Sequence, residues 1–133
     1  MEPVRQILMR VAYKGGAYHG YQVQDNARTV ADTLNAALVS VVDHPVELRA
    51  SSRTDAGVHA LDLPVAFTTT SDVPTRGIVL GANRLLPHDI RVVEAQSFSE
   101  RVDPRRKSRG KIYRYHFWNA PISSPLLSEF AWQ

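Results

Sequence analysis

The stretch TVADTLNAALVSVVDHPVELRA, residues 29–50, decides the fold because it changes from a helical to a strand pattern. Thr29 and Asp32 form a Thr-x-x-Asp signal that is typical of a helix start. Apolar side chains then recur at helical spacing, at Val30, Leu34, Ala37, Leu38 and Val41. Further along, apolar residues alternate at period two, at Val46, Leu48 and Ala50. The stretch predicts a helix over about residues 30–42, followed by a strand that ends at the stretch's last residue.

Further strands are predicted on both sides of this stretch. Alternating apolar residues from Ile7 to Tyr13 predict a first strand, and the glycine-rich residues 14–28 predict a long loop. The segments LPVAFTTT (residues 63–70), IRVVEAQSF (90–98) and KIYRYHFWN (111–119) predict three more strands. Their β-branched and aromatic residues favour extended backbone.

A second helix is predicted between the third and fourth strands. Pro74 stands at a plausible helix start, although Gly77 and Gly81 are poor helix formers. Apolar residues follow at helical spacing, at Ile78, Ala82, Leu85 and Leu86. The order is β-α-β-β-α-β with one strand added. It predicts the α+β class, as a ferredoxin-like, RRM-like antiparallel sheet with both helices on one face.

The composition indicates one ordinary globular domain. The 133 residues suit a single core, with 44% hydrophobic and 22% charged residues. The absence of cysteine excludes disulfides, thiolate zinc sites and cysteine nucleophiles. No signal peptide is recognisable, and no apolar run reaches the roughly 18 residues that a membrane span needs. We expect a single domain over residues 1–133, in the cytoplasm and without a membrane partner.

One segment of the chain concentrates positive charge. Residues 101–114 hold seven basic residues and one acid, a net charge of +6 within a chain of net charge +3. Such a segment is often only a solvated loop. In the neighbouring KIYRYHFW, however, aromatic residues interleave with basic ones. Because phosphates attract Lys and Arg and unstacked bases pack on aromatic rings, the combination favours nucleic-acid binding.

The segment RTDAGVHA, residues 53–60, brings Asp55 to a turn after the second predicted strand. One interpretation is structural, since Asp side chains accept backbone hydrogen bonds in turns and Gly57 supplies an unusual φ. The other is chemical: Arg53 favours the ionised carboxylate, which can then attack an electron-poor carbon. His59 could pair with Asp55 in acid–base chemistry, but a hydrogen-bonded turn histidine is the preferred interpretation.

RTDAGVHA resembles the signature of the tRNA pseudouridine synthase A (TruA) family. Three further segments are similar to that family, in the same order: YKGGAYHGYQVQ (residues 13–24), GANRLLPHDI (81–90) and RRKSRGKIYRY (105–115). The resemblance implies an enzyme that isomerises uridine to pseudouridine in the anticodon stem-loop, at positions 38 to 40 of the tRNA. It also implies a tRNA partner, a homodimer in the full-length protein, and chemistry with no cofactor and no metal.

The same resemblance implies roles for individual residues. Asp55 would be the nucleophile, attacking ribose C1′ or uracil C6, and Arg53 would orient it. Tyr113 would stack on the target uracil and is a candidate for moving the C5 proton. Phosphate contacts are expected at Arg105, Lys107, Arg109 and Lys111. Further RNA contacts are expected in the first loop at His19, Gln22 and Gln24.

The chain departs from the family pattern in sequence and in length, and an alternative function stays open. Ser52 stands where the family usually has Gly, and Lys14 where it usually has an acid. Family members are about twice as long, so we expect this chain to be the half that carries the catalytic Asp, with the C-terminal half absent. The alternative is a non-catalytic RNA-binding module that uses Tyr113, Tyr115 and the basic segment, with Asp55 only a turn former.

Overall fold

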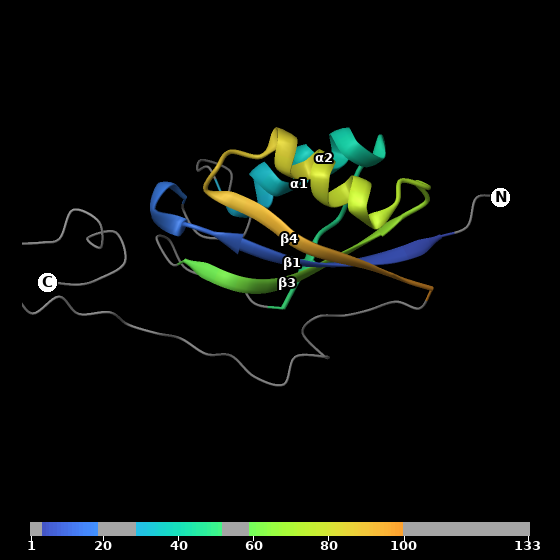
Figure 1. Cartoon of the computed structure of the whole chain (residues 1–133), viewed down its shortest axis with the longest axis horizontal. Coiled ribbons are helices and arrows are strands. Elements are labelled where there is room, and N and C mark those ends of the chain that lie inside the picture. The colour runs from blue at the N-terminus through green and yellow to red at the C-terminus, as the bar shows by residue number, and fades with distance from the viewer. Residues whose placement is uncertain (1–3, 19–28, 52–58, 100–133) are drawn as a thin grey trace, which may run out of the picture.

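The computed structural model describes residues 4–18, 29–51 and 59–99 (Figure 1). In chain order, strand β1 (Arg5–Tyr13) is followed by a short 3-10 turn, η1 (Gly15–Ala17), and helix α1 (Val30–Val42). Strands β2 (Arg49–Ala50) and β3 (Ala60–Thr69) come next. Helix α2 (Thr75–Leu85) and strand β4 (Ile90–Phe98) complete the described elements. The predicted strand over residues 111–119 lies outside the described residues.

The four described strands form one antiparallel sheet in the order β2-β3-β1-β4. Both helices lie on the same side of it (Figure 1). In this order each helix connects two parallel strands that are separated by an antiparallel one, which is the ferredoxin-like arrangement. The predicted α+β class is therefore confirmed, as is the prediction that both helices lie on one face of the sheet.

Helix α1 begins and ends where local chemistry dictates. Thr29 has extended backbone, and its Oγ1 accepts a hydrogen bond from the backbone N–H of Asp32 at 3.3 Å. At the other end, Asp43 adopts the left-handed conformation with φ 59° and donates its N–H to the carbonyl of Val39 at 2.8 Å. The predicted helix over residues 30–42 is confirmed at both ends.

Helix α2 forms despite its glycines because one of them serves packing. A Cβ added at Gly81 would meet Val41 Cγ2 at 3.1 Å. The missing side chain therefore lets α2 approach α1 closely. Ile78 and Ala82, one turn apart, are the buried residues of α2. Pro74 precedes the first helical residue, as its position predicted.

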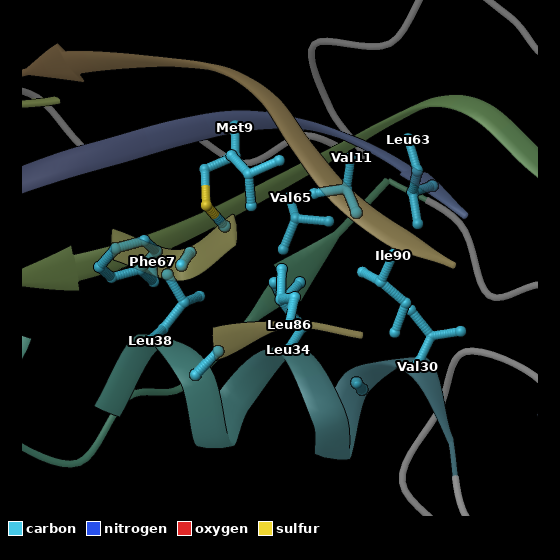
Figure 2. Packing of buried hydrophobic residues seen from close by; sticks show 14 of the residues in the cluster. Met9, Val11, Val30, Leu34, Leu38, Leu63, Val65, Phe67, Leu86 and Ile90 are labelled. Atoms are coloured by element: carbon cyan, nitrogen blue, oxygen red, sulfur yellow. The ribbon is translucent and has the colours of Figure 1, made fainter. Parts of the chain in front are cut away.

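The hydrophobic core lies between the helices and one face of the sheet (Figure 2). Alternate residues of β1 and β3 point into it, and among them Met9, Val65 and Phe67 are fully buried. Leu34 and Leu38 of α1 meet them from the helix side. This layer fixes the sheet's register, since a shift by one residue would expose every core side chain of a strand.

The second and third strands differ from prediction in length. Only Arg49 and Ala50 pair with β3, although the pattern predicted a strand from Val46. The carbonyl of Val46 instead accepts a hydrogen bond from Asn35 Nδ2 of α1 at 2.7 Å, so this segment is tied to the helix. Strand β3 begins earlier than predicted because Ala60 pairs with Tyr13 beyond a bulge.

Candidate functional site

The residues expected to act on RNA all lie outside the described residues. These are Arg53, Asp55, Tyr113, Arg105, Lys107, Arg109, Lys111, His19, Gln22 and Gln24. Their arrangement therefore stays a prediction. The segments next to two of these groups are described: residues 14–18 at the start of the first loop, and Ser51 and His59 on either side of the Asp55 segment.

These segments meet at one end of the sheet. Tyr13, the last residue of β1, pairs with Ala60 at the start of β3 and with Ile90 at the start of β4. On the far side of β3, the N–H of Ser51 donates to the carbonyl of Pro64 at 3.0 Å. The chain therefore enters the Asp55 segment beside Pro64, midway along β3, and leaves it at the end of the sheet where residues 14–18 begin. We call this end of the sheet the loop end.

A histidine joins two of the segments at the loop end. The backbone N–H of Gly15 donates to Nδ1 of His59 at 2.8 Å, across 44 positions of the sequence. Because Nδ1 accepts a hydrogen bond here, it carries no proton, and the N–H of the imidazole ring is on Nε2. The preferred interpretation of His59 as a hydrogen-bonded histidine is confirmed. The sequence did not predict that the donor would be the distant Gly15.

An aspartate fixes the other side of the same short turn. The carbonyl of Asp89 accepts the N–H of Lys14 at 2.9 Å, and its Oδ1 accepts the hydroxyl of Tyr18 at 2.5 Å. Tyr18 is buried, so its hydroxyl needs such a partner. A hydrogen bond to a carboxylate is among the stronger ones available. Residues 14–18 are thereby held by His59, which immediately precedes β3, and by Asp89, which immediately precedes β4.

The turn that presents Asp89 is itself held by side chains. Arg91 donates from one guanidinium nitrogen to the carbonyls of Pro87 at 2.9 Å and Ile90 at 2.8 Å. On α2, Asn83 donates to the carbonyl of Val92 and accepts its N–H, both at 2.8 Å. These bonds attach the end of α2 to β4, and so fix the turn that carries Asp89.

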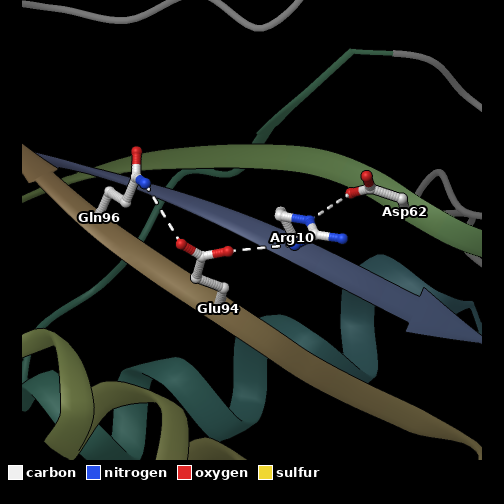
Figure 3. Close-up of polar contacts among 4 residues, drawn as sticks. All are labelled: Arg10, Asp62, Glu94 and Gln96. Atoms are coloured by element: carbon white, nitrogen blue, oxygen red, sulfur yellow. Dashed lines mark hydrogen bonds and ion pairs between the residues drawn. The ribbon is translucent and has the colours of Figure 1, made fainter.

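The face of the sheet away from the helices carries an ion-pair cluster (Figure 3). Arg10 of β1 contacts Asp62 of β3 and Glu94 of β4, each at 3.1 Å, and Gln96 donates to Glu94 at 3.3 Å. The hydrogen bond to Asp62, and after it the one to Glu94, raises the pKa of Arg10 above its ordinary value. All three charged side chains are about half exposed, so the cluster adds little to stability.

This open face also bears on the alternative function. A base-stacking sheet presents aromatic rings on its central strands. Here the two aromatic residues of the central strands, Tyr13 and Phe67, are buried in the core on the helix side. The described central strands therefore offer no aromatic platform on the open face. The two tyrosines invoked by the alternative, Tyr113 and Tyr115, lie outside the described residues.

Within the described ranges, neither a metal site nor a membrane helix is found. Among these residues no group of three or more His, Asp or Glu side chains is placed to hold a metal ion. The described helices are all too short or too polar to cross a membrane.

The fold and the contacts at the loop end define a class, a ferredoxin-like α+β domain in which segments far apart in sequence are joined at one end of the sheet. No protein-family model matches the chain. Curated proteins do match it, and three are described here. The tRNA pseudouridine synthase A of Pelobacter propionicus is 42% identical over 129 residues, 97% of this chain and 53% of its own length. The proteins of the same name from Aquifex aeolicus and Geotalea uraniireducens are 37% and 40% identical, over 95% and 97% of this chain.

The chain is therefore related to the tRNA pseudouridine synthase A family over nearly its whole length, which confirms the resemblance. It spans about half the length of the curated relatives it matches, consistent with the predicted N-terminal half.

Sequence reasoning missed the contacts that hold the loop end together. The segments that resemble the family contain Gly15, Tyr18 and Asp89, but the sequence pattern predicts no role for these three residues. Each lies within a segment that resembles the family, in YKGGAYHGYQVQ or GANRLLPHDI. That location was the available signal, since segments far apart in sequence that resemble one family are candidates for contact in its site.

Proposed function

We propose that this chain is the nucleophile-bearing part of a tRNA pseudouridine synthase that acts on uridines of the anticodon stem-loop. The observation that supports the proposal best is the convergence at the loop end of three segments that resemble the family. They are joined there through His59 and Asp89. A turn-forming role for Asp55 alone gives no reason for the segment that ends in His59 to contact two distant segments that resemble the same family. The relatives' shared name supports the same activity.

In the proposed reaction the Asp55 carboxylate attacks ribose C1′ or uracil C6, and the bond between C1′ and N1 breaks. The uracil turns, C5 bonds to C1′, the carboxylate leaves, and the C5 proton is lost while N1 gains one. No atom or electron is gained overall, so the reaction requires no redox cofactor. The target nucleotide must leave its stack, at a cost of a few kcal/mol that contacts to the RNA backbone offset.

The other residues have supporting roles in this proposal. Arg53 keeps Asp55 ionised and oriented, and Tyr113 stacks on the uracil. The basic residues Arg105, Lys107, Arg109 and Lys111 contact phosphates, and the first-loop residues His19, Gln22 and Gln24 contact the anticodon arm. The homodimer is carried over from the resemblance, and the cytoplasmic location is the expectation drawn from the composition.

The proposal is tested with a fusion protein in which this chain replaces the matching part of the Pelobacter propionicus relative. The substrate is an unmodified tRNA anticodon arm, and the product is counted as pseudouridine after digestion to nucleosides. Asp55→Ala is expected to lower product formation by about 10³-fold or more and to change tRNA binding by less than about threefold.

Two controls accompany this experiment. The intact relative is the positive control, and Asp62→Ala, which removes an exposed carboxylate of the open face, is the matched substitution. Product that persists in Asp55→Ala, or that falls equally in Asp62→Ala, contradicts the assignment of Asp55. Salt-sensitive tRNA binding without product in the unsubstituted fusion supports the RNA-binding module instead.

A further inference from the structure

The first step concerns the N-terminal end of the 3-10 turn. Gly15 is the first residue of η1 and is buried, so its N–H has no partner within the turn and needs an acceptor. The residue before it, Lys14, offers no side-chain cap. The acceptor comes instead from His59, 44 positions away, at 2.8 Å.

The second step concerns what else holds the turn. The carbonyl of Asp89 receives the N–H of Lys14, and its carboxylate receives the hydroxyl of Tyr18. Within the turn, Tyr18 also donates its N–H to the carbonyl of Gly15 at 3.0 Å. These bonds tie the turn to the start of β4. The bond to His59 connects the turn to the residue that immediately precedes β3. In sequence, this residue follows the segment that contains Asp55.

We infer that His59 is a positioning residue for the proposed reaction. Its Nδ1 holds the Gly15 turn against the start of β3, and so sets the first loop relative to the segment bearing Asp55. The inference rests on the proposed function, but the contact itself does not. His59 lies four positions after Asp55, and the candidate RNA contacts His19, Gln22 and Gln24 follow the turn directly. A shift of about 1 Å between two such groups can cost about 100-fold in rate.

The chain offers a matched pair of substitutions at this position. In His59→Asn the side-chain oxygen can occupy the place of Nδ1 and accept the Gly15 N–H. In His59→Leu the side chain has the same number and branching of heavy atoms as Asn, but a methyl group stands where the acceptor was. His59 lies outside the hydrophobic core cluster, so both variants are expected to fold. The amide of Val65, in the middle of β3, reports whether they do.

The contact is tested in the chain itself by amide hydrogen exchange. Gly15 exchange is expected to accelerate about tenfold or more in His59→Leu, and by less than about threefold in His59→Asn. Val65 exchange should stay unchanged in both. In the unsubstituted protein, ¹⁵N shifts of the His59 ring should show the proton on Nε2. A proton on Nδ1, or unchanged Gly15 exchange in His59→Leu, overturns the inference without reference to activity.

The catalytic consequence is tested in the fusion protein with the anticodon arm. His59→Leu is expected to lower kcat about 10- to 100-fold with little change in KM, because the phosphate contacts remain, and His59→Asn should recover most of kcat. If His59→Leu releases the Gly15 amide but leaves kcat unchanged, His59 does not position the site. If the unsubstituted fusion makes no pseudouridine, the proposed function fails and this consequence fails with it. The exchange data would still decide the contact.

Discussion

At the scale of single residues, Phe67 and its neighbour Thr68 show how the two faces of the sheet differ. It is the largest fully buried side chain of the described residues and points from β3 toward α1 (Figure 2). Its sequence neighbour Thr68 points the other way, where it donates to Gln6 Oε1 at 2.8 Å. Arg49 donates to the same oxygen at 2.8 Å. Alternation along β3 thus separates the apolar core from a polar network on the open face.

Removal of the Phe67 ring therefore leaves a cavity that the surrounding strands and helices cannot readily fill. Phe67→Ala is expected to lower the free energy of unfolding by about 3–5 kcal/mol. Leu80→Ala, at an exposed position of α2, is the control and should change it by about 0.5 kcal/mol or less. Urea denaturation of both variants gives the comparison. Equal, small effects would mean that the core does not lie where the structure has it.

At the scale of elements, the start of α1 depends on one hydroxyl. Thr29 is fully buried, and its Oγ1 accepts the N–H of Asp32. Thr29→Ala should lower the free energy of unfolding by about 1–2 kcal/mol, since it removes the side-chain cap from the first turn of the helix. Thr29→Ser retains the hydroxyl and should recover at least half of that loss. Thermal unfolding followed by circular dichroism measures both, and a serine variant as unstable as the alanine variant would contradict the capping role.

The elements were largely predictable from sequence because their signals are local. Helical spacing and the cap at Thr29 lie within a few residues of each other, and the apolar alternation of β1 lies within that strand. The short β2 was not predictable, because its length depends on the bond from Asn35 to Val46, between two separate segments. The contacts of His59 and Asp89 were hidden for the same reason, since Gly15 and Tyr18 lie far from them in sequence.

At the scale of the whole molecule, the positive charge expected to bind tRNA and the described sheet belong to different parts of the chain. The described sheet carries a cluster of one arginine and two carboxylates, Arg10 with Asp62 and Glu94, whereas the strongest positive charge belongs to residues 101–114. We therefore expect that segment, and not the open face, to supply the salt-dependent part of tRNA affinity. This division of charge follows from sequence for the basic segment and from structure for the open face.

Arg105→Ala in the fusion protein tests this division. The substitution should weaken binding of the anticodon arm and reduce the slope of log affinity against log salt by about one. Arg76→Ala, at the exposed start of α2, is the matched control and should leave the slope unchanged. Filter binding over a series of salt concentrations measures both. Equal slopes for the two variants would place the phosphate contacts elsewhere.

The central claim is that this chain supplies the nucleophile of a pseudouridine synthase but only part of its site. Tritium release from an anticodon arm labelled at uridine C5 tests it most directly, with three proteins side by side: the chain, the fusion protein and the fusion protein carrying Asp55→Asn. The account predicts release by the unsubstituted fusion protein, and little or none by the other two. Release by the Asp55→Asn fusion protein, or by none of the three while tRNA still binds tightly, would contradict it.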